Sequence, residues 1–333
     1  MSPAVEHVGL HLSAEEHPPD LLVATARRAE EAGFAFATIS DHFHPWTRRQ
    51  GQSPFVWGVL GAIAQVTDSI PVGTAVTCPT VRIHPAIIAQ AAATAATMLP
   101  DRFFLGVGTG ERLNECVLGD PWPSAPVRRA MLEEAVGIMR ELWTGQVMHA
   151  HRGRHYTVED ARVFTLPPAP PPIVVSGLGP RAAALAGRIG DGYMHVRPEP
   201  ELVQAFRAAG GEGKPCYGKL NVCVAADDEQ ALRTAYELWP TSGLRGELGQ
   251  QLATPEHYEQ ATATVREEDV AQSVLCSADP DRHLAALAQF GQAGFDHVVV
   301  HQYGADQERL IELYAEQVLP RLHTADAVAT SDA

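Results

Sequence analysis

Side chains that can move protons or orient a substrate follow the first, second and fourth predicted strands of this chain. Glu15 follows the first strand, His42 and Trp46 follow the second, and Glu111 follows the fourth. An imidazole can accept a hydroxyl proton while a hydride leaves the attached carbon, and a nearby carboxylate can stabilise or reprotonate the partners. These residue types are typical of a dehydrogenase. A purely structural role for His42, Trp46 or Glu15 stays open, and Glu115 is interpreted as a helix-face carboxylate.

Two glycine-containing turns could hold a phosphorylated cofactor. Residues 106–110 read Gly-Val-Gly-Thr-Gly and open onto a helix, and residues 176–180 read Ser-Gly-Leu-Gly-Pro just before another helix. Backbone N–H groups at a helix start can bind a phosphate, which is a common arrangement in (β/α)₈ barrels. A turn that only caps a helix is an equally open interpretation.

Alternating strand and helix patterns run along almost the whole chain and would position these residues. A helix is predicted over residues 20–32, and a long helix ends near residues 142–145. Eight strands are predicted, at residues 8–13, 36–40, 72–77, 103–108, 173–176, 192–196, 220–225 and 297–301. Repeated strand–helix units of this number predict a closed (β/α)₈ TIM barrel. A doubly wound open sheet is the competing fold, but it normally has a glycine-rich turn after its first strand, and residues 12–18 lack one.

One catalytic domain is predicted over residues 1–322. The polar, hairpin-like stretch that leads into a proline-rich turn is interpreted as an insertion at about residues 146–170. A second irregular segment, at about 240–269, could cover the rim or contact a partner. The small polar residues 323–333 are predicted to form a disordered tail.

Composition excludes several other classes of protein. The chain has 333 residues, with 25 Lys and Arg against 40 Asp and Glu. The formal net charge of −15 argues against a nucleic-acid or anionic-membrane binder. We find no apolar run of the roughly 20 residues that cross a bilayer and no secretory leader, so we expect a cytoplasmic protein. The five cysteines form no CxxC pair, and no metal site is expected.

Three blocks of the sequence carry a family resemblance. Residues 37–46 read ATISDHFHPW, residues 80–90 read TVRIHPAIIAQ, and residues 104–115 read FLGVGTGERLNE. Together they resemble the coenzyme F420 (deazaflavin)-dependent glucose-6-phosphate dehydrogenases, a branch of the bacterial-luciferase-like barrel superfamily. The resemblance extends over nearly the whole chain, including residues 190–192 and 297–301.

The resemblance implies a luciferase-like barrel, usually a homodimer, that moves a hydride between C5 of coenzyme F420 and a carbon bearing oxygen. It implies that His42 is the base, with Trp46 and Glu111 around the reacting centre and Glu15 nearby. The family has a cis peptide that forms a bulge behind the deazaflavin ring at the position of Ala75-Val76. The cofactor would be contacted by Asp41, Ala75, Val76, Cys78, Gly108, Thr109 and Asn114, and its phosphate by Ser176, Gly177, Leu178 and Gly179.

Departures from the family concern the substrate. Glu199 and Gln272 stand where the sugar-phosphate enzymes have lysines, so a phosphate would lose two cations unless Arg197 compensates. His195, His301 and Tyr303 are expected at the same rim and suit a neutral polyol, sugar or secondary alcohol. We therefore expect a small-molecule dehydrogenase that is not strict for glucose 6-phosphate.

Two alternatives stay open. One is an FMN-dependent monooxygenase of the same superfamily, and the other is a non-catalytic deazaflavin-binding protein.

Overall fold

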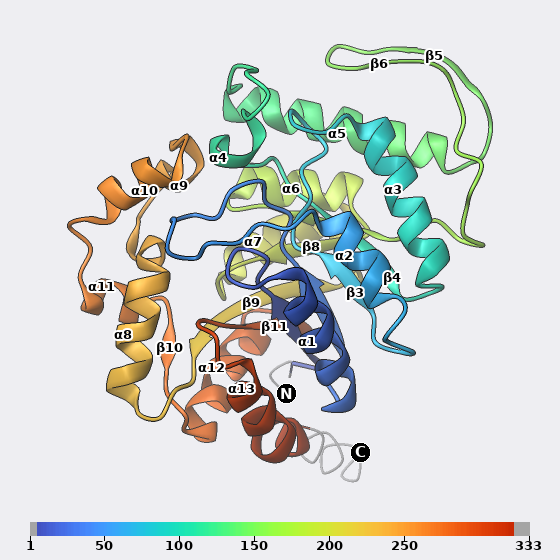
Figure 1. Cartoon of the computed structure of the whole chain (residues 1–333). Coiled ribbons are helices and arrows are strands. Elements are labelled where there is room, and N and C mark those ends of the chain that lie inside the picture. Colours follow the sequence, from blue (N-terminus) through green and yellow to red (C-terminus); the bar gives the residue numbers. More distant parts are fainter. Residues whose placement is uncertain (1–4, 323–333) are drawn as a thin grey trace.

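Eight parallel strands close into a barrel, as the sequence predicts (Figure 1). The computed structural model describes residues 5–322, so the predicted disordered tail at 323–333 lies outside the described residues. The barrel strands are β1 (His7–Leu12), β2 (Phe36–Ile39), β3 (Val72–Thr74), β4 (Phe103–Val107), β7 (Ile173–Ser176), β8 (Gly192–His195), β9 (Cys216–Cys223) and β11 (His297–Gln302). The barrel closes because β11 pairs with both β9 and β1, and β9 also pairs with β8. A short strand, β10 (Leu275–Cys276), adds to β9.

Helices surround the barrel, and the rim carries several short ones. The helices are α1 (Pro19–Glu31), α2 (Val56–Ile63), α3 (Pro85–Met98), α4 (Arg112–Glu115), α5 (Ala125–Leu142), α6 (Pro180–Ile189), α7 (Pro200–Phe206), α8 (Asp228–Leu238), α9 (Leu248–Gln251), α10 (Pro255–Thr262), α11 (Glu267–Ala271), α12 (Pro280–Gln292) and α13 (Gln307–Leu313), with single turns η1 (Arg207–Gly211), η2 (Pro240–Gly243) and η3 (Tyr314–Val318). Many begin with proline in the first turn, where its missing N–H costs no hydrogen bond. No helix within residues 5–322 combines the length and apolar character needed to cross a bilayer.

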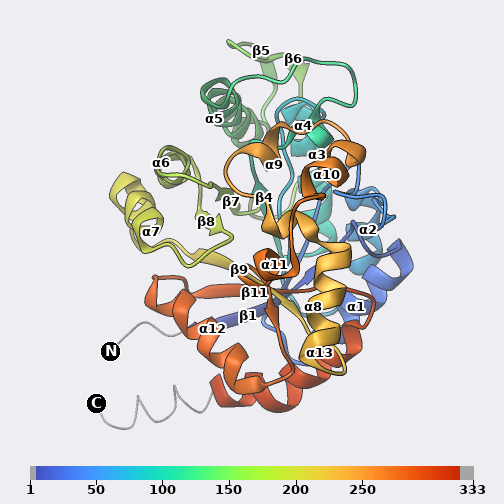
Figure 2. The same ribbon diagram turned by 90° about the vertical axis from the view of Figure 1, so that its left-hand side faces the viewer.

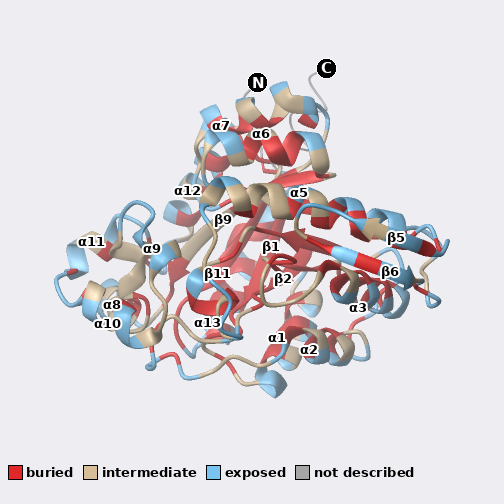
Figure 3. Ribbon diagram, turned by 90° about the horizontal axis from the view of Figure 1, so that it is seen from above, coloured by how far each residue is buried: buried red, intermediate tan, exposed pale blue. Residues whose placement is uncertain are grey.

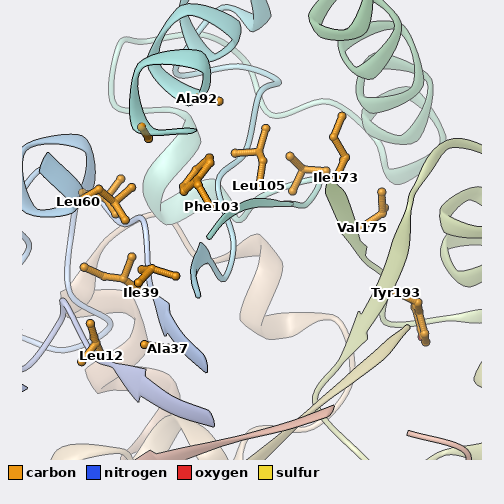
Figure 4. Close-up of a cluster of buried hydrophobic side chains, with 14 of the residues drawn as sticks. Leu12, Ala37, Ile39, Leu60, Ala92, Phe103, Leu105, Ile173, Val175 and Tyr193 are labelled. Atoms are coloured by element: carbon orange, nitrogen blue, oxygen red, sulfur yellow. The ribbon is translucent and has the colours of Figure 1, made fainter. Parts of the chain in front are cut away.

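The main hydrophobic core lies between the strands and the surrounding helices. Figure 4 shows Ile39, Leu105 and Val175 on this outer side of the strands, and the view from above shows the buried strands inside a shell of partly exposed helices (Figure 3). A second, smaller cluster of Phe36, Phe104, Val174, Met194 and Val299 fills one level of the barrel lumen. The two clusters use opposite faces of the same strands, because successive side chains of a strand alternate.

Beyond the aromatic level, the lumen-facing side chains become polar. Tyr217 contacts the lumen cluster, with its ring centroid 5.5 Å from that of Phe104. The next residues on the same face of β9 are Lys219 and Asn221, and both are only partly buried. His301 on β11 is level with Asn221 in the strand register. The carboxyl end of the barrel is therefore a polar space and not a continuation of the core.

The two interruptions of the barrel pattern form small structures of their own. Residues 148–161 make an antiparallel hairpin of β5 (Met148–Arg152) and β6 (Thr157–Ala161). Its turn is held by the Glu134 carboxylate, which accepts hydrogen bonds from the backbone N–H groups of His155 and Tyr156. The segment after α8 contains η2, α9, α10 and α11 where the sequence pattern looked irregular, and it projects beside the barrel mouth (Figure 2).

Two strand boundaries differ from the prediction by three residues or more. The strand β9 begins at Cys216, not at residue 220. The prediction started late because Gly218 weakens the strand pattern, whereas in the structure this glycine leaves room for a neighbouring side chain. A β-carbon there would lie only 2.4 Å from Cδ1 of Phe290. The strand β3 ends at Thr74, not at residue 77, because the Ala75–Val76 peptide is cis and the chain leaves the strand ladder there.

Candidate active site

The carboxyl ends of β1 and β2 bring His42 and Glu15 together. His42 Nε2 lies 3.5 Å from Glu15 Oε1, and the two side chains are 10% and 4% exposed. The Trp46 ring is next to them, with its centroid 5.0 Å from that of the His42 imidazole. Tyr258 of α10 packs edge-on against Trp46, with a centroid separation of 5.3 Å, so the rim segment also reaches this point. An imidazole, a carboxylate and an indole therefore lie together at the carboxyl ends of β1 and β2.

Asn114 holds the other side of the His42 ring. Its Oδ1 accepts hydrogen bonds from the backbone N–H groups of Phe43, at 2.9 Å, and His44, at 3.1 Å. These two donors fix the amide orientation, so Nδ2 is the atom that lies 3.0 Å from His42 Nδ1. The His44 carbonyl oxygen is 3.2 Å from the same Nδ1. Because Nδ1 faces one donor and one acceptor, it has a partner whether or not it carries a proton, and Nε2 can exchange a proton without turning the ring.

Glu15 is held in its charged form. Burial alone would raise the pKa of Glu15, but the nearby His42 charge and the Ser40 hydroxyl outweigh it and leave that pKa below its ordinary value. Ser40 Oγ donates to Glu15 Oε2 at 2.5 Å, and Ser13 Oγ donates to the same oxygen at 3.2 Å. The second carboxylate oxygen, Oε1, is the one that faces His42. Glu15 can therefore stabilise a protonated imidazole.

A second buried network surrounds Asp41. Its Oδ1 accepts from the Arg82 guanidinium at 2.8 Å, and its Oδ2 accepts from the Thr77 hydroxyl at 2.8 Å. Arg82 also lies 3.7 Å from Glu115, whose carboxylate accepts from the backbone N–H of Arg82 at 3.0 Å. Glu115 is 1% exposed, which corrects its interpretation as a helix-face carboxylate. Burial raises the pKa of Glu115 to about 7.

Glu111 lies near the mouth but does not touch His42 in the structure. Its backbone carbonyl accepts the first hydrogen bonds of the short helix α4, from Asn114 and Glu115. Its carboxylate makes no hydrogen bond or ion pair within the described part of the chain, although its charge raises the pKa of Cys78 and Tyr258. Glu111 is half-buried and remains available to a ligand.

The expected cofactor positions follow β3 and β4, and Ala75 and Val76 among them pack against the lumen cluster. The cis peptide at Ala75–Val76 is present, as the resemblance implied. A β-carbon at Gly108 would lie 2.7 Å from Val76 Cγ2, so glycine keeps this wall clear. Thr109 is half-buried beside it. Cys78 is buried, and burial with the Glu115 charge raises the pKa of its thiol well above the ordinary value, so the group stays neutral.

The turn of Ser176, Gly177, Leu178 and Gly179 connects β7 to the start of α6. Gly179 is the N-cap residue and provides no side-chain cap, so backbone N–H groups at the helix start stay available to an anion. The turn is fixed from behind, because the Gly177 carbonyl accepts from the Tyr193 hydroxyl at 2.7 Å. Leu178 is 53% exposed at its tip.

His195 does not share the lumen with His301, contrary to the expectation that both line one rim. The side chain of Met194 faces the lumen cluster, so the next residue points outward. His195 Nδ1 lies 3.1 Å from the Gly177 carbonyl oxygen, and its Nε2 lies 3.4 Å from the Glu199 carboxylate. His195 therefore supports the turn at the start of α6. Arg197 lies nearby, 61% exposed and 4.0 Å from Glu199.

His301 does face the lumen, together with groups that sequence reasoning missed. Its ring centroid is 4.5 Å from that of His11 and 5.0 Å from that of Trp239. Tyr303 is buried beside it and bonds to Ser242 at 3.0 Å. The polar groups that sequence reasoning missed are Arg82, Glu16 and Lys219. Glu16 directly follows Glu15, which is the one local signal that could have indicated it. No group of three or more His, Cys, Asp or Glu within residues 5–322 is arranged to hold a metal ion.

Comparison with known proteins identifies the family to which this chain belongs. The model of the luciferase-like monooxygenase family matches residues 3–297, and the chain belongs to this family. The chain is 36% identical over 326 residues to an F420-dependent glucose-6-phosphate dehydrogenase of Microbacterium testaceum, covering 94% of this chain and 96% of the relative. It is 34% identical to the protein of the same name from Mycobacterium tuberculosis, covering 95% of this chain and 97% of the relative.

Solved structures agree with this assignment. An F420-dependent secondary alcohol dehydrogenase in complex with an F420–acetone adduct superposes with a TM-score of 0.86 at 29% identity, covering 96% of this chain and 98% of that chain. An F420-dependent tetrahydromethanopterin reductase from Methanopyrus kandleri superposes with a TM-score of 0.78 at 20% identity, covering 96% of this chain and 100% of that one. The second likeness shows the fold alone.

Proposed function

We propose that this chain is a coenzyme F420-dependent dehydrogenase that oxidises a sugar or a secondary alcohol and is not strict for glucose 6-phosphate. Membership of the luciferase-like family, the named relatives and the alcohol dehydrogenase structure support the F420-dependent activity. The observation that carries the proposal is the 3.5 Å approach of the His42 imidazole to the buried Glu15 carboxylate at the barrel mouth.

The residues around the mouth fit such a cofactor. The wall at Gly108 is free of side chain, and the uncapped N-terminus of the ten-residue helix α6 suits a phosphate. Asp41, Cys78, Thr109 and Asn114 would lie along the ring and its tail, with Ala75 and Val76 behind the ring. When bound, coenzyme F420 supplies the deazaflavin carbon C5 that exchanges the hydride. Asp41 is held in place by Arg82 and Thr77, so its position does not depend on the ligand.

His42 takes the proton of the substrate hydroxyl at Nε2. In the form ready to accept it, Nδ1 carries the ring proton and donates to the His44 carbonyl. After uptake the imidazolium keeps that hydrogen bond, and its new charge faces the Glu15 carboxylate. Trp46, whose ring centroid is 5.0 Å from that of His42, would wall the reacting carbon, and the half-buried Glu111 would serve as a second acid or base.

The rim charges argue against a phosphorylated substrate. Gln272 is neutral, and its side-chain oxygen accepts from Arg245 at 3.0 Å. Glu199 adds a negative charge, and Arg197 is 4.0 Å from that carboxylate, so the cation is partly neutralised. A phosphate dianion at this rim would meet less positive charge than two lysines supply.

Anaerobic stopped-flow mixing with oxidised coenzyme F420 tests the proposal. We expect the absorbance of the oxidised cofactor to fall with at least one member of a panel of sugars, phosphosugars and secondary alcohols. We expect His42→Ala to abolish that change while leaving cofactor binding intact. Absence of any reaction across the panel would refute the dehydrogenase. Retention of FMN instead of F420 by the purified protein would support the monooxygenase alternative.

The protein forms a homodimer through the apolar groove between α2 and α3. The groove measures about 320 Å³ and includes Phe55, 62% exposed, and Ile87, 57% exposed. Trp57 lies in the same groove, and its buried Nε1–H has no hydrogen-bond partner within the described residues. A second copy of the chain could bury the exposed Phe55 and Ile87 side chains in a self-complementary contact. Light scattering should give twice the chain mass for the wild type and one chain mass for Ile87→Glu, whereas a monomeric wild type would refute the dimer.

A cytoplasmic location is part of the proposal. Cys78, Cys116, Cys216, Cys223 and Cys276 are all free thiols, and free thiols suit a reducing compartment.

A further inference from the structure

Lys219 is a cation inside the barrel that has no partner. The chain contains only two lysines, Lys214 and Lys219. The Lys214 ammonium donates to the carbonyls of Gly187 and Gly190, at 2.9 and 2.8 Å. Lys219, on the lumen face of β9, makes no hydrogen bond or ion pair with any residue from 5 to 322 and is only partly buried by surface area. An ammonium with three donors on this face therefore has none of them paired with a described residue.

Three further lumen groups lack hydrogen-bond partners. His301 is 0% exposed, and neither of its ring nitrogens has a hydrogen-bond partner among the described residues, although Nε2 lies 3.9 Å from the Glu16 carboxylate. The Nε2 of His11 and the Oδ1 of Asn221 are also unpartnered in that part of the chain. The His11 and His301 rings pack against each other, and Asn221 is level with His301 in the strand register. Buried polar groups without partners are rare, so several on one lumen face indicate a ligand or ordered water.

The charges around this cluster nearly balance. Burial lowers the pKa of Lys219 to about 8, partly offset by the negative charges of Glu15 and Glu16. Burial and the Lys219 charge lower the pKa of both His11 and His301 well below the ordinary value, so both rings are neutral. A neutral imidazole offers one donor and one acceptor. The cluster therefore presents mixed donors and acceptors with little net positive charge.

We propose that Lys219, His301, Asn221 and His11 form a second polar subsite in the barrel lumen that binds hydroxyl groups of the substrate beyond the reacting carbon. This inference rests on the proposed function and names its substrate class, a neutral polyhydroxylated compound such as a polyol or an unphosphorylated sugar. A hydroxyl is both donor and acceptor and matches such a mixed set. A simple alcohol would leave these groups to water, and an anion would meet Glu15 and Glu16 as well as the ammonium.

The subsite lies deeper in the barrel than the base and within range of its charge. Lumen-facing residues two apart on a strand are roughly 7 Å apart along it. His11 is four residues before Glu15, and Ser13, which faces the same lumen, donates to the Glu15 carboxylate. The charge of His42 still acts on His11, which places the base and the subsite in one electrostatic environment. A polyol that reacts at His42 would direct its further hydroxyls toward this cluster, and the Lys219 charge acts on Glu15 beside the base.

The test compares alcohols of matched length with and without extra hydroxyls. The ratio of kcat/KM for erythritol to that for sec-butanol is measured with coenzyme F420 in the wild type, Lys219→Met and Asn221→Leu. Lys214→Met is the matched control, because it makes the same change at the other lysine. Thermal melting checks that each variant is folded, and Asn221→Leu keeps the test valid if Lys219→Met fails to fold.

We expect the ratio to exceed one in the wild type and to fall about tenfold in both lumen variants, as loss of a hydrogen bond to a charged or buried group implies. The control should keep the wild-type ratio. Equal losses for both alcohols, or no loss, would overturn the subsite while leaving the dehydrogenase standing. If no alcohol reacts, the proposed function fails separately, and calorimetry with erythritol on the cofactor-free protein decides the subsite: binding that Lys219→Met weakens supports it, and no binding overturns it.

Discussion

Replacing Glu15 with glutamine tests whether a buried carboxylate drives proton uptake at His42. The substitution keeps the side-chain shape and removes one charge at 3.5 Å from Nε2. Coulomb's law at an effective dielectric constant of about 20 gives about 5 kcal/mol for unit charges at that separation, which is an upper limit. The contact is longer than a good hydrogen bond, and the Lys219 charge also acts on Glu15. We therefore expect a loss of about 2 to 3 kcal/mol, or roughly 30- to 150-fold in the rate of hydride transfer.

Single-turnover stopped-flow measures this rate directly, with coenzyme F420 saturating and the best alcohol of the panel. Because the pKa of Glu15 lies below its ordinary value, wild-type Glu15 is charged at neutral pH and the whole effect should be present there. Glu134→Gln is the control, since it makes the same change at a carboxylate that holds the β5–β6 hairpin turn. A folded Glu15→Gln protein that transfers hydride at the wild-type rate would refute the reasoning.

Three further predictions concern groups outside the His42 pair. Burial raises the pKa of Glu115 from 4.5 to about 7, so the folded chain holds this proton more tightly than the unfolded chain. Its contribution to the free energy of unfolding, at most about 3 kcal/mol, is present below pH 4.5 and is lost as the pH rises through 7. Urea titrations should show that the free energy of unfolding depends less on pH in Glu115→Gln than in the wild type. Gly106→Ala should lower the urea midpoint by an amount worth about 2 kcal/mol or more, because its β-carbon would lie 1.8 Å from a backbone carbonyl oxygen. Gly137→Ala, in α5 with open space around it, should instead raise stability by about 0.5 to 1 kcal/mol. After reductive ¹³C-methylation, NMR should show Lys219 titrating near pH 8, and titration of Lys219 at the ordinary lysine value of 10.5 would contradict its burial.

The barrel could be predicted from the sequence because its units repeat. Each strand is a short apolar run and each helix carries its own start signals, so local patterns determined the element order. The boundaries of β9 and β3 could not be predicted in the same way. The start of β9 depends on Gly218 fitting against Phe290, which lies 72 residues further along the chain. The end of β3 depends on the Ala75–Val76 cis peptide, for which only the family resemblance gave a signal.

The sequence could predict the site residues that lie in loops after the strands. It could not predict which side chains within a strand face the lumen. His42 and Glu15 lie in the loops after β2 and β1, so knowing the strand ends was enough. His195 is the last residue of β8 and His301 the last but one of β11, but His195 faces the helices and His301 faces the lumen. Strands buried on both sides are apolar on both faces, so no alternation in the sequence reveals which face a residue takes. The Arg82–Glu115 contact joins segments that only the folded chain brings together.

Charges at the rim and charges in the lumen both affect whether a phosphorylated substrate can bind. A charge reversal at the rim can distinguish the two effects. At the rim, Gln272 and Glu199 provide no cation. Gln272 engages Arg245, and Glu199 engages Arg197. Within residues 5–322, Lys219 is the unpaired cation that faces the lumen. Glucose 6-phosphate should therefore react more slowly than glucose. The double variant Glu199→Lys with Gln272→Lys should reverse that order, because each new cation near a phosphate contributes about 1 kcal/mol or more. Steady-state kcat/KM for the two sugars measures the change. If the double variant keeps the wild-type order, the rim does not select against phosphate, and the preference must arise at the Glu15 and Glu16 carboxylates of the lumen instead.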